Sequence, residues 1–111
     1  MTSQIAIIGA GGWGTALAIA MARAGRTDIR LWAFEPYLVE TILATRENPL
    51  YLPGARIPAS VTVTNSLADA LTEAKVVIVA VPSHVLRSVV AQMIPYLIRE
   101  MMFVSAARSR M

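Results

Sequence analysis

Short runs of apolar and β-branched residues alternate along the chain with stretches in which apolar residues recur every three or four positions. The runs cover residues 5–8, 29–33, 61–64, 76–81 and 101–106. Such runs predict strands, and those without a polar residue predict strands that are buried on both faces of a sheet. The three- to four-residue recurrence predicts amphipathic helices.

The order of these elements predicts the fold class. Strands that alternate with helices indicate βαβ units and an α/β fold with a parallel sheet. Because such crossovers are right-handed, helices are expected on both faces of the sheet. We therefore predict a Rossmann-type, doubly wound sheet with the spatial order 3-2-1-4-5, truncated after about five strands.

Two helices are expected in the first half of the chain. One covers residues 13–24, and Gly25 follows it as a C-terminal cap. The other begins at Pro36, because proline is favoured at the first helical position. Its predicted buried stripe consists of Leu38, Ile42 and Leu43.

The second half of the chain contains a predicted loop and two further helices. Residues 48–58 contain three prolines and are predicted to form a loop. Ser66 and Asp69 resemble a capping box, which would begin a short helix. Ser83 is expected to cap a longer helix, which Pro95 bends or ends. The predicted buried stripe of the longer helix consists of Leu86, Val89, Val90 and Met93.

No charged residue occurs from Met1 to Ala22, so a signal peptide and a membrane helix are both alternatives for this run. A signal peptide carries positive charge before its apolar core, but the first basic residue here is Arg23. Positions 9–14 contain four glycines, each of which would cost about 1 kcal/mol in a helix relative to alanine. We therefore expect neither a signal peptide nor a membrane span.

Composition narrows the function classes further. Apolar residues make up 56% and charged residues 15% of the chain, against about 25% charged in an average domain. This excess of apolar residues suggests a surface that packs against another domain. The net charge is +3, but the only lysine is Lys75 and the arginines are scattered, so no nucleic-acid surface is expected. The absence of cysteine excludes disulfides and thiolate metal sites, and no metal site is predicted.

The glycine-rich stretch fits the pattern G-x-G-x-x-G between a predicted strand and a predicted helix, the context in which this pattern binds dinucleotides. Gly9 would permit the turn, Gly11 the approach of a pyrophosphate, and Gly14 close packing of helix and strand. The helix N-terminus would attract the phosphates. The alternative is a tight turn without a ligand.

An acidic residue is expected about 20 residues after this pattern, where it binds a ribose hydroxyl. Glu35 lies near that position, and its charge would repel a 2′-phosphate by several kcal/mol. This favours NAD as the cofactor and leaves NADP as the second option. The alternative is that Glu35 only caps the helix at Pro36. Phe34 is expected against the adenine, with ordinary packing as its alternative.

The far side of the predicted crevice follows the fourth strand. The ligand of such a sheet lies beyond the carboxyl ends of the strands, where the strand order reverses. Val81, Pro82, Ser83 and His84 are therefore expected to form this side, with Pro82 and Ser83 in contact with the cofactor. His84 could act as an acid or base, but no carboxylate neighbours it in the sequence, and a surface histidine is the simpler interpretation. No catalytic residue is assigned.

Four stretches resemble the N-terminal part of NAD(P)-dependent glycerol-3-phosphate dehydrogenases. They are IAIIGAGGWGTALA, LW at 31–32, TRENPLYLPG at 45–54 and VVIVAVPS at 76–83. The resemblance covers residues 4 to 106, and N-x-x-Y-L-P-G is its most specific part. It implies interconversion of sn-glycerol 3-phosphate and dihydroxyacetone phosphate, which supplies glycerophospholipid synthesis. Gly12, Trp13 and Phe34 match cofactor positions of the family.

Two departures from the family pattern change what is expected. Bacterial members often have arginine where this chain has Phe34, which again favours NAD. The family continues V-S-A-T-K-G after the fifth strand, whereas this chain has Arg108 at the position of that substrate-contacting lysine. We therefore expect a dinucleotide-binding domain over 1–106, a non-family tail over 107–111 and no substrate domain. The chain alone is then expected to be inactive.

The expected partners are a small-molecule dinucleotide and the missing C-terminal domain or a second copy of the chain. The expected location is the cytoplasm. Two other functions remain open: a stand-alone NAD-sensing regulatory module, and the N-terminal half of a different Rossmann oxidoreductase.

Overall fold

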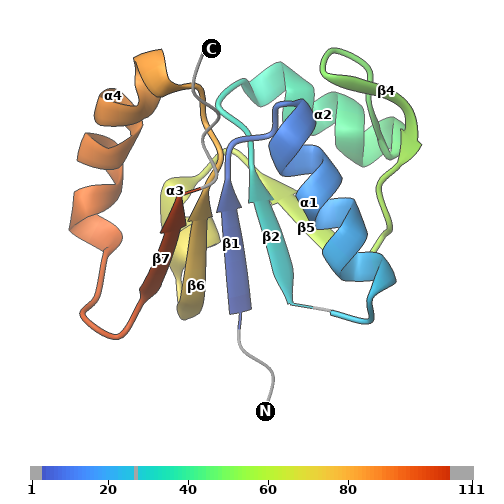
Figure 1. The fold of residues 1–111 in the computed structure, drawn as a ribbon. Coiled ribbons are helices and arrows are strands. Elements are labelled where there is room, and N and C mark those ends of the chain that lie inside the picture. Colours follow the sequence, from blue (N-terminus) through green and yellow to red (C-terminus); the bar gives the residue numbers. More distant parts are fainter. Residues whose placement is uncertain (1–3, 27, 106–111) are drawn as a thin grey trace.

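The computed structural model describes residues 4–26 and 28–105; the predicted tail at 107–111, with Arg108, and the last residue of the strand predicted at 101–106 lie outside the described residues. A five-stranded parallel sheet has the order β5-β2-β1-β6-β7, which is 3-2-1-4-5 when its strands are numbered along the chain (Figure 1). The predicted fold class and strand order are therefore confirmed. The strands are β1 (Gln4–Ile8), β2 (Ile29–Trp32), β5 (Val61–Thr64), β6 (Ala74–Val79) and β7 (Met102–Ser105).

Helices cover both faces of this sheet, as predicted. In Figure 1, α1 lies in front of the sheet and α3 behind it. The short 3-10 helix η1 contains Pro95, so the long helix before it ends there. The helical elements are α1 (Gly12–Arg23), α2 (Pro36–Thr45), α3 (Leu67–Leu71), α4 (Ser83–Met93) and η1 (Ile94–Tyr96).

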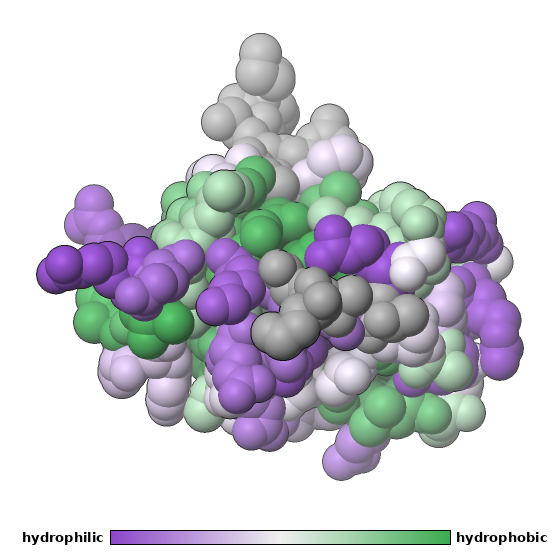
Figure 2. Space-filling view, turned by 90° about the horizontal axis from the view of Figure 1, so that it is seen from below, coloured by the Kyte–Doolittle hydropathy of each residue, from purple (hydrophilic) through white to green (hydrophobic). Residues whose placement is uncertain are grey.

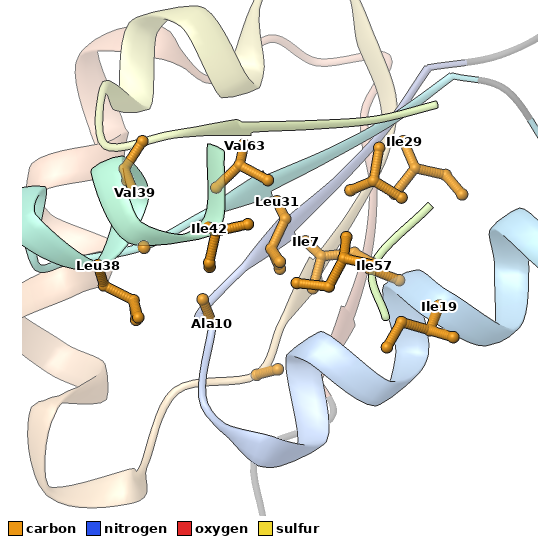
Figure 3. Packing of buried hydrophobic residues seen from close by; sticks show 14 of the residues in the cluster. Ile7, Ala10, Ile19, Ile29, Leu31, Leu38, Val39, Ile42, Ile57 and Val63 are labelled. Atoms are coloured by element: carbon orange, nitrogen blue, oxygen red, sulfur yellow. The ribbon is translucent and has the colours of Figure 1, made fainter. Parts of the chain in front are cut away.

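Successive side chains of the central strands are buried alternately in two hydrophobic cores, one on each face of the sheet. Ile5 and Ile7 pack with residues of α1 and α2, and Figure 3 shows this cluster around Ile7 and Leu31. Ala6 and Ile8 point to the other side and pack with residues of α3 and α4. Since successive side chains of a strand point to opposite faces, a strand with two cores must be apolar at every position. This explains the uninterrupted apolar runs.

The loop predicted at 48–58 was partly wrong. A two-stranded antiparallel hairpin forms there from β3 (Glu47–Asn48) and β4 (Leu52–Arg56). Only two residue pairs are in register, Glu47 with Arg56 and Asn48 with Leu52. The proline and glycine inside β4 are tolerated because the ladder is short and β4 has a partner on one side only, so few of its backbone N–H groups must donate to another strand.

The buried stripe of α2 also differs from the prediction. Leu38 and Ile42 are buried, but Leu43 is 56% exposed and Val39 lies in the core instead. Leu43 is five residues after Leu38 and thus about 140° away around a helix of 3.6 residues per turn. In α4, Val89 and Met93 are buried as predicted, whereas Val90, which follows Val89 and lies about 100° from it around the helix, is exposed.

The predicted helix caps were confirmed in part. Gly25 follows α1 with a φ of 99°, the left-handed conformation expected of a C-terminal glycine cap. Ser66 Oγ accepts from the Asp69 N–H at 3.1 Å, but the Ser66 N–H donates to Thr64 Oγ1, so only half of the capping box forms. The cap predicted for Ser83 was wrong: Pro82 is the cap residue, and Ser83 is already inside the first helical turn.

The surface is uneven in polarity. At the amino ends of the strands, hydrophilic residues lie beside separate hydrophobic patches (Figure 2). A group of exposed apolar side chains follows α4 and continues along the edge strand β7. It comprises Ile94, Tyr96, Ile98, Met102, Phe103 and Val104. No helix within 4–26 and 28–105 is long and apolar enough to cross a membrane.

Ile42 and Leu43 are adjacent residues of equal size in α2, so replacing each of them tests how the helix is oriented. We expect Ile42→Ala to lower the free energy of unfolding by about 2–5 kcal/mol, because it leaves a cavity in a closed core. Leu43→Ala should change it by less than about 0.5 kcal/mol, since Leu43 faces solvent. Urea unfolding followed by circular dichroism measures both variants, and equal losses would contradict the observed orientation.

Candidate functional site

The glycine-rich turn joins β1 to α1 at the carboxyl edge of the sheet, which is uppermost in Figure 1. Gly9 has a φ of 125°, and a Cβ there would lie 2.8 Å from the Ala80 carbonyl oxygen. A Cβ on Gly14 would lie 1.8 Å from the Gly9 carbonyl oxygen. The turn and the close helix–strand packing predicted for these two glycines are thus seen.

The other two glycines of the turn differ from each other. A Cβ on Gly11 would meet nothing within 4 Å, so the loop is open at this position. A Cβ on Gly12 would lie 2.9 Å from the Tyr51 carbonyl oxygen. Gly12 is therefore needed for contact with the β3–β4 hairpin, a role that the motif alone did not predict.

The N-terminus of α1 is suited to an anion. Gly11 is its cap residue, no side chain caps the helix, and its first turn contains no acidic residue. Since the first N–H groups of a helix have no partner within the helix, those of α1 and the positive end of its dipole are available to an anion at this turn. Backbone groups of this kind bind phosphate without any basic side chain.

A cavity of about 500 Å³ lies beside this turn, between the ends of β1, β2 and β6 and the first turns of α4. Its wall is mostly apolar, with polar groups at Glu35, Tyr51, His84 and Ser88. The lining residues are Gly9, Ala10, Gly11, Gly12, Trp32, Phe34, Glu35, Tyr51, Ala80, Val81, Pro82, His84, Val85, Ser88 and Val89.

Six of the nine predicted site residues line this cavity: Gly9, Gly11, Gly12, Phe34, Glu35 and Pro82. The other three do not. Gly14 is buried in the helix–strand contact, while Trp13 and Ser83 are exposed and are not among the lining residues. Cofactor contact stays a prediction for all nine.

Trp32 and Phe34 form an aromatic wall on the β2 side. Their rings meet edge to face with centroids 6.1 Å apart. Phe34 is 65% exposed, so one face is free to stack on a flat ligand. The Trp32 indole Nε1 is buried and has no hydrogen-bond partner within the described part of the chain.

Glu35 combines a structural and a site position. Its backbone begins α2, and its carbonyl oxygen accepts from the Leu38 N–H. However, its side chain makes no capping hydrogen bond; Oε2 accepts from the Tyr51 hydroxyl at 2.8 Å. Glu35 is thus the cap residue of α2, as the alternative expected, but its carboxylate does not take part in the cap and binds Tyr51 instead.

Asn48 connects the hairpin to the glycine-rich turn. The residue is completely buried. Its Nδ2 donates to the Ala10 carbonyl at 2.7 Å and to Thr15 Oγ1 at 2.9 Å. Its Oδ1 accepts from the Tyr51 N–H at 3.1 Å. One side chain thus holds Tyr51 over the turn.

Sequence reasoning missed Asn48 and Tyr51 as site residues, and also Trp32, Val85, Ser88 and Val89 in the wall. A signal existed for the first two. An Asn side chain that accepts from a backbone N–H a few residues later is a common turn former. The bond between Asn48 and the Tyr51 N–H spans three residues, one more than in the usual turn of this kind, and three prolines made the stretch resemble an unstructured loop.

The environment of Tyr51 changes its acidity. The hydrogen bond to Glu35 raises the pKa of the Tyr51 phenol above its usual value of about 10, and burial and the charge of Glu35 add to this effect. The hydroxyl is therefore a stable donor at neutral pH.

Comparison with known proteins agrees with this geometry. Residues 4–108 match the family model described as the N-terminus of NAD-dependent glycerol-3-phosphate dehydrogenase. A glycerol-3-phosphate dehydrogenase [NAD(P)+] of Koribacter versatilis is 55% identical over 106 residues, which are 96% of this chain and 32% of the relative. The Geobacter sulfurreducens counterpart is 44% identical over 97% of this chain and 32% of its own length.

A solved structure shows the same likeness in three dimensions. The glycerol-3-phosphate dehydrogenase of Coxiella burnetii superposes with a TM-score of 0.91 at 31% identity, over 97% of this chain and 33% of its own. This chain therefore spans about a third of the length of the relatives that it matches.

Replacing the buried amide should destabilise the site. We expect Asn48→Ala to lower the free energy of unfolding by about 1–3 kcal/mol, because buried groups such as the Ala10 carbonyl lose their partner. Asn65→Ala, at an exposed position, is the control and should change it by less than about 0.5 kcal/mol. Thermal or urea unfolding measures both, and a loss no larger than that of the control would contradict the network.

The Tyr51 hydroxyl should titrate at a higher pH than a free tyrosine. Because its folded-state pKa is raised, its stabilising effect is present below about pH 10 and is lost as the pH rises through the folded-state value. Tyrosinate absorbance in a Tyr37→Phe, Tyr96→Phe background isolates this titration. Adding Glu35→Gln should move the midpoint toward the ordinary value, and an unmoved midpoint would contradict the hydrogen bond as its cause.

Proposed function

Because the chain belongs to the family of NAD-dependent glycerol-3-phosphate dehydrogenases through the N-terminal part of these enzymes, we propose that it is the dinucleotide-binding part of such an enzyme. The observation that carries the proposal is the cavity beside an open, glycine-rich helix N-terminus. The match over residues 4–108 favours this function over the stand-alone NAD sensor and the different oxidoreductase.

The residues of the cavity fit a dinucleotide in three places. The pyrophosphate would lie against the turn at Gly11, where the backbone is open and N–H groups are free. The adenine would lie between Phe34 and the α4 side chains, since this wall is apolar. The adenosine ribose would lie near Glu35, whose carboxylate accepts hydrogen bonds only.

The same arrangement supports a preference for NAD over NADP. The 2′-phosphate of NADP would approach the Glu35 carboxylate, and two like charges at about 4 Å near a protein surface repel by several kcal/mol. Positions 33 and 34 are Ala33 and Phe34, so neither provides a cation for the phosphate. The ribose hydroxyl of NAD would instead donate to the carboxylate.

The reaction we propose for the whole enzyme is interconversion of glycerol 3-phosphate and dihydroxyacetone phosphate. The nicotinamide, when bound, would accept or supply the hydride. The residues of this chain bind and orient the dinucleotide. Trp13, Gly14 and Ser83 do not line the cavity, and they stay proposed cofactor contacts at its edge. Hydride transfer also requires a substrate held in near-attack geometry. Since the relatives are about three times as long, we propose that the 111 residues alone do not catalyse this reaction.

A domain that completes the enzyme would also account for the exposed apolar residues along β7, because large exposed patches mark interaction surfaces. A second copy of the chain is the other occupant that the sequence suggested. The dinucleotide-binding domain over 1–106, the tail at 107–111, the cytoplasmic location and the lack of nucleic-acid binding stay predictions.

The proposal is tested by binding of NAD and NADP to the 111-residue chain, measured by calorimetry and by tryptophan fluorescence, since Trp32 lines the cavity. We expect binding of both, with NAD tighter. Gly11→Ala should keep the fold, because its Cβ meets no protein atom, yet weaken binding about tenfold, or 1.4 kcal/mol, by narrowing the phosphate site.

Asn65→Ala serves as the control for this binding experiment, because the residue is exposed and outside the cavity lining. Its affinities should equal those of the unchanged chain. If the chain bound neither dinucleotide, the proposed function would be wrong. Tighter binding of NADP would contradict only the role of Glu35.

A further inference from the structure

The hydrogen bond between Tyr51 and Glu35 joins two separate segments at the rim of the cavity. Glu35 follows β2, while Tyr51 lies in the turn between β3 and β4, sixteen residues later. Both line the cavity. The Tyr51 hydroxyl donates to Glu35 Oε2 at 2.8 Å, so the hairpin determines where that carboxylate oxygen lies.

Tyr51 is itself held by its backbone. Its N–H donates to Asn48 Oδ1, and its carbonyl oxygen packs on Gly12. Asn48 is in turn bound to the Ala10 carbonyl in the glycine-rich turn. A continuous set of contacts therefore runs from the proposed phosphate site through Asn48 and Tyr51 to the carboxylate of Glu35.

This arrangement matters because Glu35 has a flexible side chain at a half-exposed position. A glutamate without a partner would sample several rotamers, many of them directed into water. A carboxylate that moves away neither accepts from a ribose hydroxyl nor repels a 2′-phosphate effectively. With Oε2 bound to Tyr51, the other oxygen keeps a fixed place and its lone pairs remain for a ligand.

We propose that Tyr51 is a positioning residue for cofactor selectivity, which holds the Glu35 carboxylate where it accepts from the ribose of NAD and repels the 2′-phosphate of NADP. The inference rests on the proposed function, since it requires that the cavity bind a dinucleotide. It assigns to the N-x-x-Y stretch a role in discrimination between cofactors.

The test compares dissociation constants of NAD and NADP for the 111-residue chain and three variants: Tyr51→Phe, Glu35→Gln and the double variant. Tyr51→Phe should reduce the preference for NAD on the order of fivefold, the size expected for a partly exposed hydrogen bond to a charge. It should weaken NAD binding and strengthen NADP binding. In the Glu35→Gln background, the same change should leave the ratio unaltered.

Tyr37→Phe is the matched control, because Tyr37 is also exposed but lies outside the cavity lining. It should leave the preference unchanged. Circular dichroism and thermal unfolding verify that each variant folds. A loss of general packing would weaken both cofactors in parallel and would not move their ratio.

The outcomes separate the inference from the function on which it rests. If Tyr51→Phe leaves the ratio unchanged, or lowers it equally in the Glu35→Gln background, the positioning role is overturned while dinucleotide binding stands. If Tyr51→Phe strengthens NAD binding, Tyr51 competes with the ribose, and the inference is overturned. If the unchanged chain binds neither cofactor, the proposed function fails and the inference fails with it.

Discussion

The close approach of α1 to the end of β1 is the contact on which the rest of the site depends. A Cβ on Gly14 would lie 1.8 Å from the Gly9 carbonyl oxygen, so no other residue fits at position 14 without moving the helix. This contact sets where the first turn of α1 begins and thus where its free N–H groups point. It also puts Gly12 at the place where the Tyr51 carbonyl packs.

The hairpin depends on this arrangement more than on its own pairing. Two residue pairs in register give little stability to an isolated ladder. The additional support comes from polar contacts at both ends. Asn48 binds the glycine-rich turn, and the guanidinium of Arg46 donates to the carbonyls of Ile57 and Val61. A buried amide with satisfied hydrogen bonds specifies one geometry, because any displacement leaves polar groups unpaired.

Sequence patterns were sufficient for the sheet and insufficient for the rim of the site. Burial on both faces gives a strong pattern, because residues 5–8 of β1 and 76–79 of β6 are all apolar, and the strand order followed from the alternation with helices. The roles of Gly9 and Gly14 followed from a motif whose constraints are local. The contacts of Asn48 could not be predicted in this way, since its partners Ala10 and Thr15 lie more than thirty residues earlier. Leu43 was predicted on the wrong side of its helix, and Ser83 was predicted as the cap although the helix begins one residue earlier. Helix ends are the least certain part of such predictions.

Glu35 shows why the site and the fold cannot be separated here. Its backbone begins α2, so its Cα position is set by packing of Leu38 and Ile42 in the core. The Glu35 side chain makes no capping hydrogen bond to the helix, so its carboxylate is available for other contacts. In the hairpin, the Tyr51 hydroxyl donates to this carboxylate, and it reaches the carboxylate only because Asn48 holds the turn in place. The core thus determines where the charge is attached, and the hairpin determines where it points. The stretch N-x-x-Y and the glycine-rich turn therefore act as one unit, although they are far apart along the chain.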